Sequence, residues 1–162
     1  MKYCFCIFFL LTISTSSFGQ QQHRINCIIL VNGQIVNGEI SNLYLTNTTL
    51  AVKEFINYYP GELIIEDSIY QSLVADSLNF NLHFDYNTFT VHEHLIRNFE
   101  CELNIKLFHY PYLIIDFFDF NDPDYKAKYE DYTDKDFLVQ FTFPESGIWI
   151  PKVNEKKERI KQ

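Results

Sequence analysis

The clearest pattern in the chain is a strict alternation of hydrophobic and polar residues over positions 78–86. Every second residue from Leu78 to Tyr86 is apolar or aromatic, and each residue between them is Asn, His or Asp. Positions 99–107 repeat the alternation, with Glu, Asn and Lys at the polar positions. A period of two places one face of a strand in a core and the other in water. The pattern therefore predicts two strands, joined by a hairpin connection over the polar residues 92–98.

Less regular apolar segments predict the other strands. Two of them, residues 25–31 and 34–40, flank Asn32-Gly33, a pair that favours a tight hairpin turn because both residues accept a positive φ. The almost unbroken apolar run over residues 112–120 is typical of a strand that is covered on both faces. The remaining expected strands are residues 43–53, 63–66 and 137–143.

Residues 68–75 carry a helical signal. Ile69 and Leu73 are four residues apart, and Asp67 or Ser68 can cap a helix. We expect one short helix here, and the alternative is a polar loop that leads into the next strand.

About eight short strands with few helices predict an all-β, mainly antiparallel fold. We expect a β-sandwich of about seven to nine strands, with one short helix near residues 68–75. The 162-residue chain is 47% hydrophobic and 17% aromatic, which suits a single core and excludes a disordered or low-complexity protein. We expect one domain over residues 20–151, followed by a basic and disordered tail at residues 152–162.

The first residues follow the pattern of a secretory signal peptide. Lys2 precedes an apolar run over residues 5–13, and Ser17 and Gly19 put small side chains three and one residues before a cleavage point. The apolar run is shorter than the ~20 residues that a membrane-spanning helix needs. We therefore expect a signal peptide over residues 1–19, an exported protein in the periplasm or outside the cell, and no transmembrane segment in the mature chain.

The net charge of −8 bears on the choice of partner. A nucleic-acid-binding surface needs clustered cations against the phosphates, so we expect no nucleic-acid partner. We expect instead a protein or glycan partner in the cell envelope.

Cys27 and Cys101 are the two cysteines of the expected mature chain, and alternation places both on apolar strand faces. An exported chain meets an oxidising compartment, where such a pair can form a disulfide. The alternative is two buried free thiols that pack as small hydrophobic residues. The distance between the two Cα atoms decides between them, because a bridge needs a separation below about 7 Å.

Two patterns could hold a metal ion. His92 and His94 are two residues apart, so on a strand both imidazoles would point to the same side. The alternative is a pair of solvated histidines at a hairpin tip. Asp119, Asp122 and Asp124 stand in an acidic segment whose oxygens could bind calcium, although it lacks the regular Asp spacing and the Gly of a calcium loop. The alternative there is a solvated acidic loop, and we expect no other cofactor.

Aromatic residues are the candidate ligand contacts, since a tyrosine ring offers a flat apolar face with a polar tip. The alternative is that the rings complete a core already rich in Phe. The candidates are Tyr110, Tyr112, Tyr125 and Tyr129.

The chain has no Gly-rich phosphate loop, no Gly-x-Ser-x-Gly segment and no Cys-x-x-Cys pair, so no residue is assigned a catalytic role. We expect an exported, non-catalytic β-sandwich that acts as a binding or envelope-assembly module. One alternative is a glycan or small-ligand binder that uses surface aromatics. The other is a small envelope hydrolase, for which His83, His92, His94 and Asp85 are the group of interest.

Overall fold

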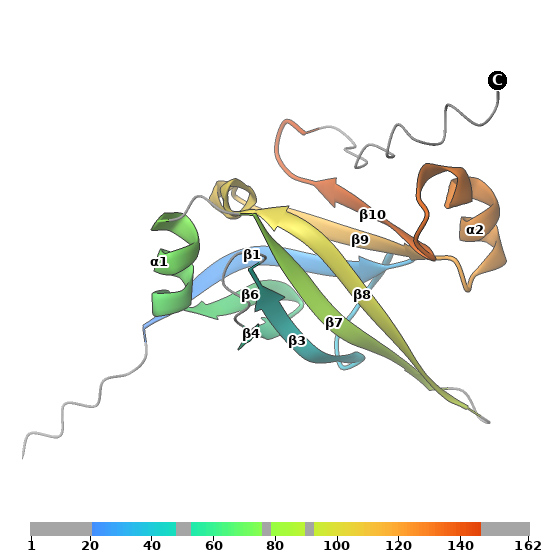
Figure 1. The fold of residues 1–162 in the computed structure, drawn as a ribbon, viewed down its shortest axis with the longest axis horizontal. Helices are drawn as coiled ribbons and strands as arrows, with labels where there is room; N and C mark the ends of the chain where they lie inside the picture. Colours follow the sequence, from blue (N-terminus) through green and yellow to red (C-terminus); the bar gives the residue numbers. More distant parts are fainter. Residues whose placement is uncertain (1–20, 48–52, 76–78, 90–92, 147–162) are drawn as a thin grey trace, which may run out of the picture.

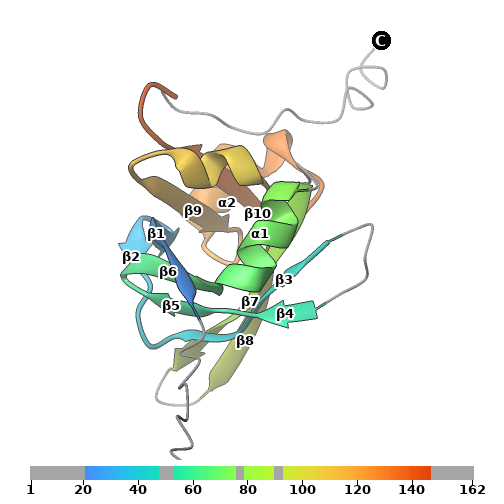
Figure 2. The ribbon, with the colours of Figure 1, turned by 90° about the vertical axis from the view of Figure 1, so that its left-hand side faces the viewer.

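A computed structural model describes residues 21–47, 53–75, 79–89 and 93–146 of the chain. These residues form two β-sheets, rich in antiparallel pairs, that pack face to face, with ten strands and a few short helices. The predicted β-sandwich is therefore confirmed. The predicted signal peptide and basic tail lie outside the described residues. Figure 2 shows the two layers, with β1, β6 and β9 in one and β3, β7 and β8 in the other.

The first sheet has six strands, in the order β10-β9-β1-β6-β5 with β2 paired beside β1. Among the described strands, β1 and β9 form the one parallel pair, with Ile29 opposite Ile115. The sequence patterns alone did not indicate this pair, because the chain passes through the other sheet between the two strands. The strands are β1 (Gln22–Val31), β2 (Gln34–Ile35), β5 (Asn57–Tyr59), β6 (Gly61–Glu66), β9 (Leu113–Asp119) and β10 (Phe137–Thr142).

The second sheet has four strands in the order β4-β3-β7-β8. They are β3 (Ile40–Thr46), β4 (Lys53–Phe55), β7 (Asn79–Phe89) and β8 (His94–Asn104). β7 and β8 pair along their whole length, from Asn79 opposite Asn104 to Phe89 opposite His94. The predicted connection over residues 92–98 is thus too long, because β8 begins at His94. β3 pairs with β7 only as far as Tyr86, so the end of the β7–β8 ribbon projects beyond its neighbour (Figure 1).

Short helices connect the strands. The predicted short helix is confirmed as α1 (Asp67–Ala75), and α2 (Pro123–Tyr129) lies at the opposite end of the sandwich (Figure 1). Two 3₁₀ turns, η1 (Ile105–His109) and η2 (Glu130–Tyr132), precede β9 and β10. None of the helices within the described ranges is long and apolar enough to cross a membrane.

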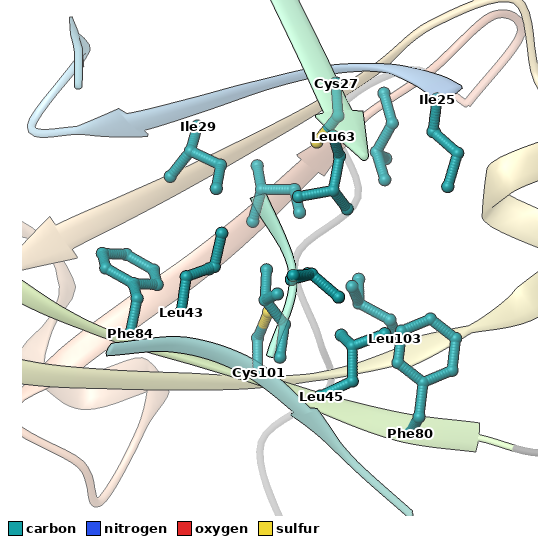
Figure 3. Close-up of a cluster of buried hydrophobic side chains, with 14 of the residues drawn as sticks. Ile25, Cys27, Ile29, Leu43, Leu45, Leu63, Phe80, Phe84, Cys101 and Leu103 are labelled. Carbon is teal, nitrogen blue, oxygen red and sulfur yellow. The ribbon is translucent and has the colours of Figure 1, made fainter. Parts of the chain in front are cut away.

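The core lies between the two sheets. It is formed by the apolar face that the alternation predicted for each strand. β1 contributes Ile25 and Ile29, and β7 contributes Phe80 and Phe84, all at most 3% exposed (Figure 3). A smaller cluster on the other face of β9 contains Phe118 under α2. The strand is thus covered on both faces at its C-terminal end, whereas Ile114 and Asp116 earlier on the same outer face are only partly buried.

Cys27 and Cys101 are both buried and both unpaired, so the disulfide that the sequence allowed is absent. Cys27 belongs to β1 and Cys101 to β8, on opposite sides of the core (Figure 3). Packed sheets stand about 10 Å apart, which exceeds the Cα separation of about 7 Å that a bridge tolerates. The structure therefore agrees with the alternative, in which both thiols are free and pack as small hydrophobic residues.

Candidate functional site

The outer face of the four-stranded sheet carries a row of side chains that crosses all four strands. Strand register places Phe55 of β4 opposite Tyr44 of β3, Tyr44 opposite His83 of β7, and His83 opposite Glu100 of β8. The row continues into the loop before β10, where Lys135 Nζ lies 3.2 Å from Glu100 Oε1. We call these five residues the cross-strand row.

His83 is the chemical centre of the row. Its Nε2 lies 2.8 Å from the hydroxyl of Thr46, at hydrogen-bond distance, and its Nδ1 lies 3.4 Å from Glu100 Oε2. Partial burial lowers the pKa of His83 from its usual value. The carboxylate of Glu100 opposes this decrease, and the ammonium groups of Lys135 and Lys53 add to it. The imidazole is therefore neutral at neutral pH. In the tautomer with its proton on Nδ1, on the side of Glu100, the neutral ring accepts a hydrogen bond from the Thr46 hydroxyl at Nε2.

Aromatic packing holds the other half of the row. Tyr44 stacks on His83, with ring centroids 4.7 Å apart and an interplanar angle of 10°. Lys53 Nζ lies 3.8 Å from the centroid of the Tyr44 ring, at the distance of a cation–π contact. Phe55 meets the edge of Tyr44 and is 62% exposed. The row thus presents one exposed apolar ring beside polar and charged groups.

A second polar row lies next to the first. Asp85 is held between two amides, since Asn42 donates to its Oδ2 and Asn98 donates to its Oδ1. Further along the same face, Asn79 donates to Glu102. Each carboxylate and amide is fixed in orientation by a neighbour on another strand, so the face offers an ordered set of donors and acceptors.

A hollow of about 610 Å³ runs along this face. It lies between the outer side of β7 and β8 and the loop that carries Asp134 and Lys135. Small-molecule sites in proteins typically have volumes of about 300–1,000 Å³, so the hollow is large enough for a ligand. Its polar lining residues are Tyr44, His83, Asp85, Asn98, Glu100, Asp134, Lys135 and Asp136.

The predicted metal ligands do not converge among the residues that the structure describes. His94 stacks on Phe89 and its Nε2 lies 3.1 Å from Asn87 Oδ1, while His92 lies outside the described residues. No group of three or more His, Cys, Asp or Glu side chains in the described ranges could hold a metal ion. Both the histidine site and the calcium site stay predictions.

Each aspartate of the predicted calcium site makes a contact within the protein or begins a helix. Asp119 is 8% exposed, contacts Arg97 and accepts the backbone N–H of Asn121. Asp122 caps α2 by accepting the N–H of Asp124, which stands in the first turn of that helix. Ion pairing and the start of a helix thus account for these three aspartates.

The four predicted tyrosine contacts do not form one surface. Tyr125 and Tyr129 of α2 stack on Phe118, and the Tyr125 hydroxyl donates to the carbonyl of Asn32. Those two rings therefore pack the small cluster under α2. Tyr110 packs on Phe143, and Tyr110 and Tyr112 are 39% and 44% exposed.

The sequence reasoning selected His83 and Asp85 but missed Tyr44, Thr46 and the row as a whole. Alternation shows which side chains of β7 and β8 point outward, and this signal was available. It does not show which residues of β3 and β4 lie beside them, because register is set by long-range pairing.

Comparison with known protein families, with curated proteins and with solved structures found no match to this chain.

Proposed function

We propose that the protein is an exported binding module that holds a glycan on the outer face of its four-stranded sheet. Export rests on the signal-peptide pattern of the first 19 residues. The proposal of a glycan rests on the fixed Asn42–Asp85–Asn98 group and on the exposed ring of Phe55, which lines one hollow together with Asn42.

The chemistry of this face matches the chemistry of a sugar. Sugar hydroxyls both donate and accept, so they pair with carboxylates and amides whose orientation is already set. The Asn42–Asp85–Asn98 group provides such partners without losing conformational freedom on binding. The apolar C–H face of a sugar ring packs on an aromatic ring, and Phe55 is available for that contact.

The charges around the hollow narrow the class of glycan. Its lining contains four carboxylates, those of Asp85, Glu100, Asp134 and Asp136. Lys135 pairs with Glu100 and Arg97 pairs with Asp136, so the carboxylates still outnumber these two cations. An acidic sugar would meet repulsion there. We therefore expect neutral or amino sugars to bind better than uronic acids.

The experiment is a titration of the purified protein with neutral oligosaccharides selected on a glycan array. We expect Phe55→Ala and Asp85→Asn each to weaken binding by about ten-fold, the loss of one good contact. Tyr59→Ala is the matched control, because Tyr59 is also 62% exposed but lies on β5 of the other sheet. The proposal fails if no neutral or amino sugar binds, or if the Tyr59 variant loses as much affinity as the Phe55 variant.

A protein partner is a second candidate, supported by the free end of the β7–β8 ribbon. Phe89 and Ile96 lie on one face of the ribbon there and are 74% and 54% exposed, and Leu95, on the other face, is 46% exposed. Exposed apolar side chains at the end of a projecting ribbon are typical of a protein-interaction site. Ile96→Ser should reduce capture of a partner from the producing cells, whereas Ile35→Ser, at a 60% exposed site on β2, should not. Equal capture of the partner by both variants would exclude the ribbon end as the site that binds it.

A further inference from the structure

Thr46, His83 and Glu100 come from three neighbouring strands and line up as a hydroxyl, an imidazole and a carboxylate. The Thr46 hydroxyl lies 2.8 Å from Nε2 of His83, and Glu100 Oε2 lies 3.4 Å from Nδ1 on the other side of the ring. A nucleophile within hydrogen-bond reach of a base, with a third group beside the base, is the arrangement that activates a hydroxyl for acyl transfer.

We propose that Thr46, His83 and Glu100 form a relay that hydrolyses a short-chain ester through an acyl group carried on Thr46. This activity goes beyond glycan binding and does not require it. Thr46 and His83 are the catalytic residues, because they touch the reacting atoms. Glu100 is a positioning residue, because it acts through the His83 ring.

The surroundings supply the remaining requirements. Lys53 is the register partner of Thr46, and its ammonium lies on the same face, over the Tyr44 ring. It is placed to stabilise the negative oxygen that forms when a carbonyl is attacked. His83 and Tyr44 also line the hollow of about 610 Å³ on this face, and the Thr46 hydroxyl contacts His83 there. A hollow of this size has room for a short-chain ester, which we take as the substrate class.

The reaction balances with the ester and water alone. Thr46 Oγ1 bonds to the ester carbonyl carbon while His83 Nε2 takes the hydroxyl proton. The bond to the alcohol then breaks, and Nε2 passes that proton to the leaving alcohol. Water next attacks the acyl carbon and gives a proton to Nε2, and the bond to Oγ1 breaks as Nε2 returns a proton to Oγ1. The products are the acid and the alcohol.

The rate should depend on the protonation of His83. The charged and titratable groups around it are Tyr44 on β3, Lys53 on β4, Glu100 on β8 and Lys135 in the loop before β10. The base works only when neutral, so the rate rises with pH through a midpoint below that of an ordinary histidine.

The experiment incubates the full chain with p-nitrophenyl acetate and follows both product release and the mass of the protein. We expect one acetyl group on Thr46, located by peptide mapping. Thr46→Val and His83→Gln should each reduce acetylation of that peptide by about a hundred-fold, the usual contribution of a nucleophile and its base. Thr46→Ser should retain activity. The controls are Thr142→Val on β10 and His109→Gln in η1, which lie outside the relay.

The Glu100→Gln variant tests whether Glu100 acts on His83 or has only a structural role. Removing the carboxylate removes the interaction that raises the pKa of His83, so the pH midpoint of the reaction should move further down. The proposal is overturned if wild-type Thr46 is not acetylated, if Thr46→Val reacts like the wild type, or if the midpoint does not move. A protein that binds sugar but fails these tests would refute the relay and leave the glycan proposal intact.

Discussion

Arg97 and Asp119 join the two sheets through a partly buried ion pair. Arg97 lies on β8 and Asp119 at the end of β9, and the Nη2–Oδ1 distance is 2.9 Å. The same nitrogen lies 2.9 Å from Asp136 Oδ2, which precedes β10. The Asp119 side chain is only 11% exposed, whereas that of Asp136 is 66% exposed. One arginine thus has two carboxylate partners in very different surroundings.

The first prediction follows from that difference. Asp119→Ala should destabilise the fold by about 3 kcal/mol, because it removes the buried partner of Arg97 and leaves the N–H of Asn121 unpaired. Asp136→Ala is the matched control and should cost less than about 1 kcal/mol, because that carboxylate is solvated. Urea denaturation of both variants measures the comparison, and equal losses would contradict it.

The second prediction concerns the thiols. Burial raises the pKa of Cys27 to about 12, and it raises the pKa of Cys101 even further. Thiolates are the reactive form, so iodoacetamide should not label the native protein and should label both cysteines after unfolding in denaturant. Mass analysis without a reductant supplies the readout. A mass lower by two hydrogens, with no label after unfolding, would mean that the bridge forms after all.

The third prediction is a stability change at mildly acidic pH. The pKa of His83 is lower in the folded protein than in the unfolded chain, so the unfolded chain binds more protons in the window just below pH 6.5. Stability should therefore fall as pH falls from about 7 through that window. His83→Gln should remove this part of the dependence, and His109→Gln should not. Denaturation midpoints at pH 7.5 and pH 5 test it, and parallel curves for wild type and His83→Gln would refute it.

The fourth prediction is a stabilising substitution at Asp116. Burial raises the pKa of this carboxyl, against the opposing effect of the Gly33 N–H that donates to it. The folded state thus favours the protonated acid, so the ionised form costs stability at neutral pH and the cost disappears as pH falls below the unfolded pKa. Asp116→Asn should raise the denaturation midpoint at pH 7, since an amide oxygen still accepts from Gly33. The gain should vanish near pH 3, and a loss at pH 7 would contradict the argument.

The fifth prediction tests the tight turn between β1 and β2. Gly33 has φ of +74°, and a Cβ there would meet nothing nearer than the Tyr125 hydroxyl at 4.0 Å. Gly33→Ala should therefore cost about 1 kcal/mol through backbone conformation alone. Gly38→Ala is the control, because Gly38 lies outside the left-handed region and a Cβ there has nothing within 4 Å. Thermal unfolding compares the two, and an equal or larger loss at Gly38 would contradict the assignment.

Local chemistry accounts for the parts of the fold that the sequence predicted. The turn at Asn32-Gly33 forms as expected, with φ of 53° and 74°, because two adjacent residues that tolerate positive φ define a two-residue hairpin by themselves. The short helix at 68–75 was predicted from a cap and a four-residue spacing. Residues 34–40 were expected as one strand, but a turn at Gly38 divides them, so that Gln34–Ile35 form β2 and Ile40 begins β3.

Alternation alone determined which face of each strand enters the core, because adjacent side chains of a strand point to opposite sides. It placed both cysteines in the interior and His83 and Asp85 on the outer face. Tertiary structure alone decided which strands lie side by side and in which register, because a shift by two residues preserves every buried face. That choice put Cys27 and Cys101 in different sheets, made β1 and β9 parallel, and brought Thr46, His83 and Glu100 into one line.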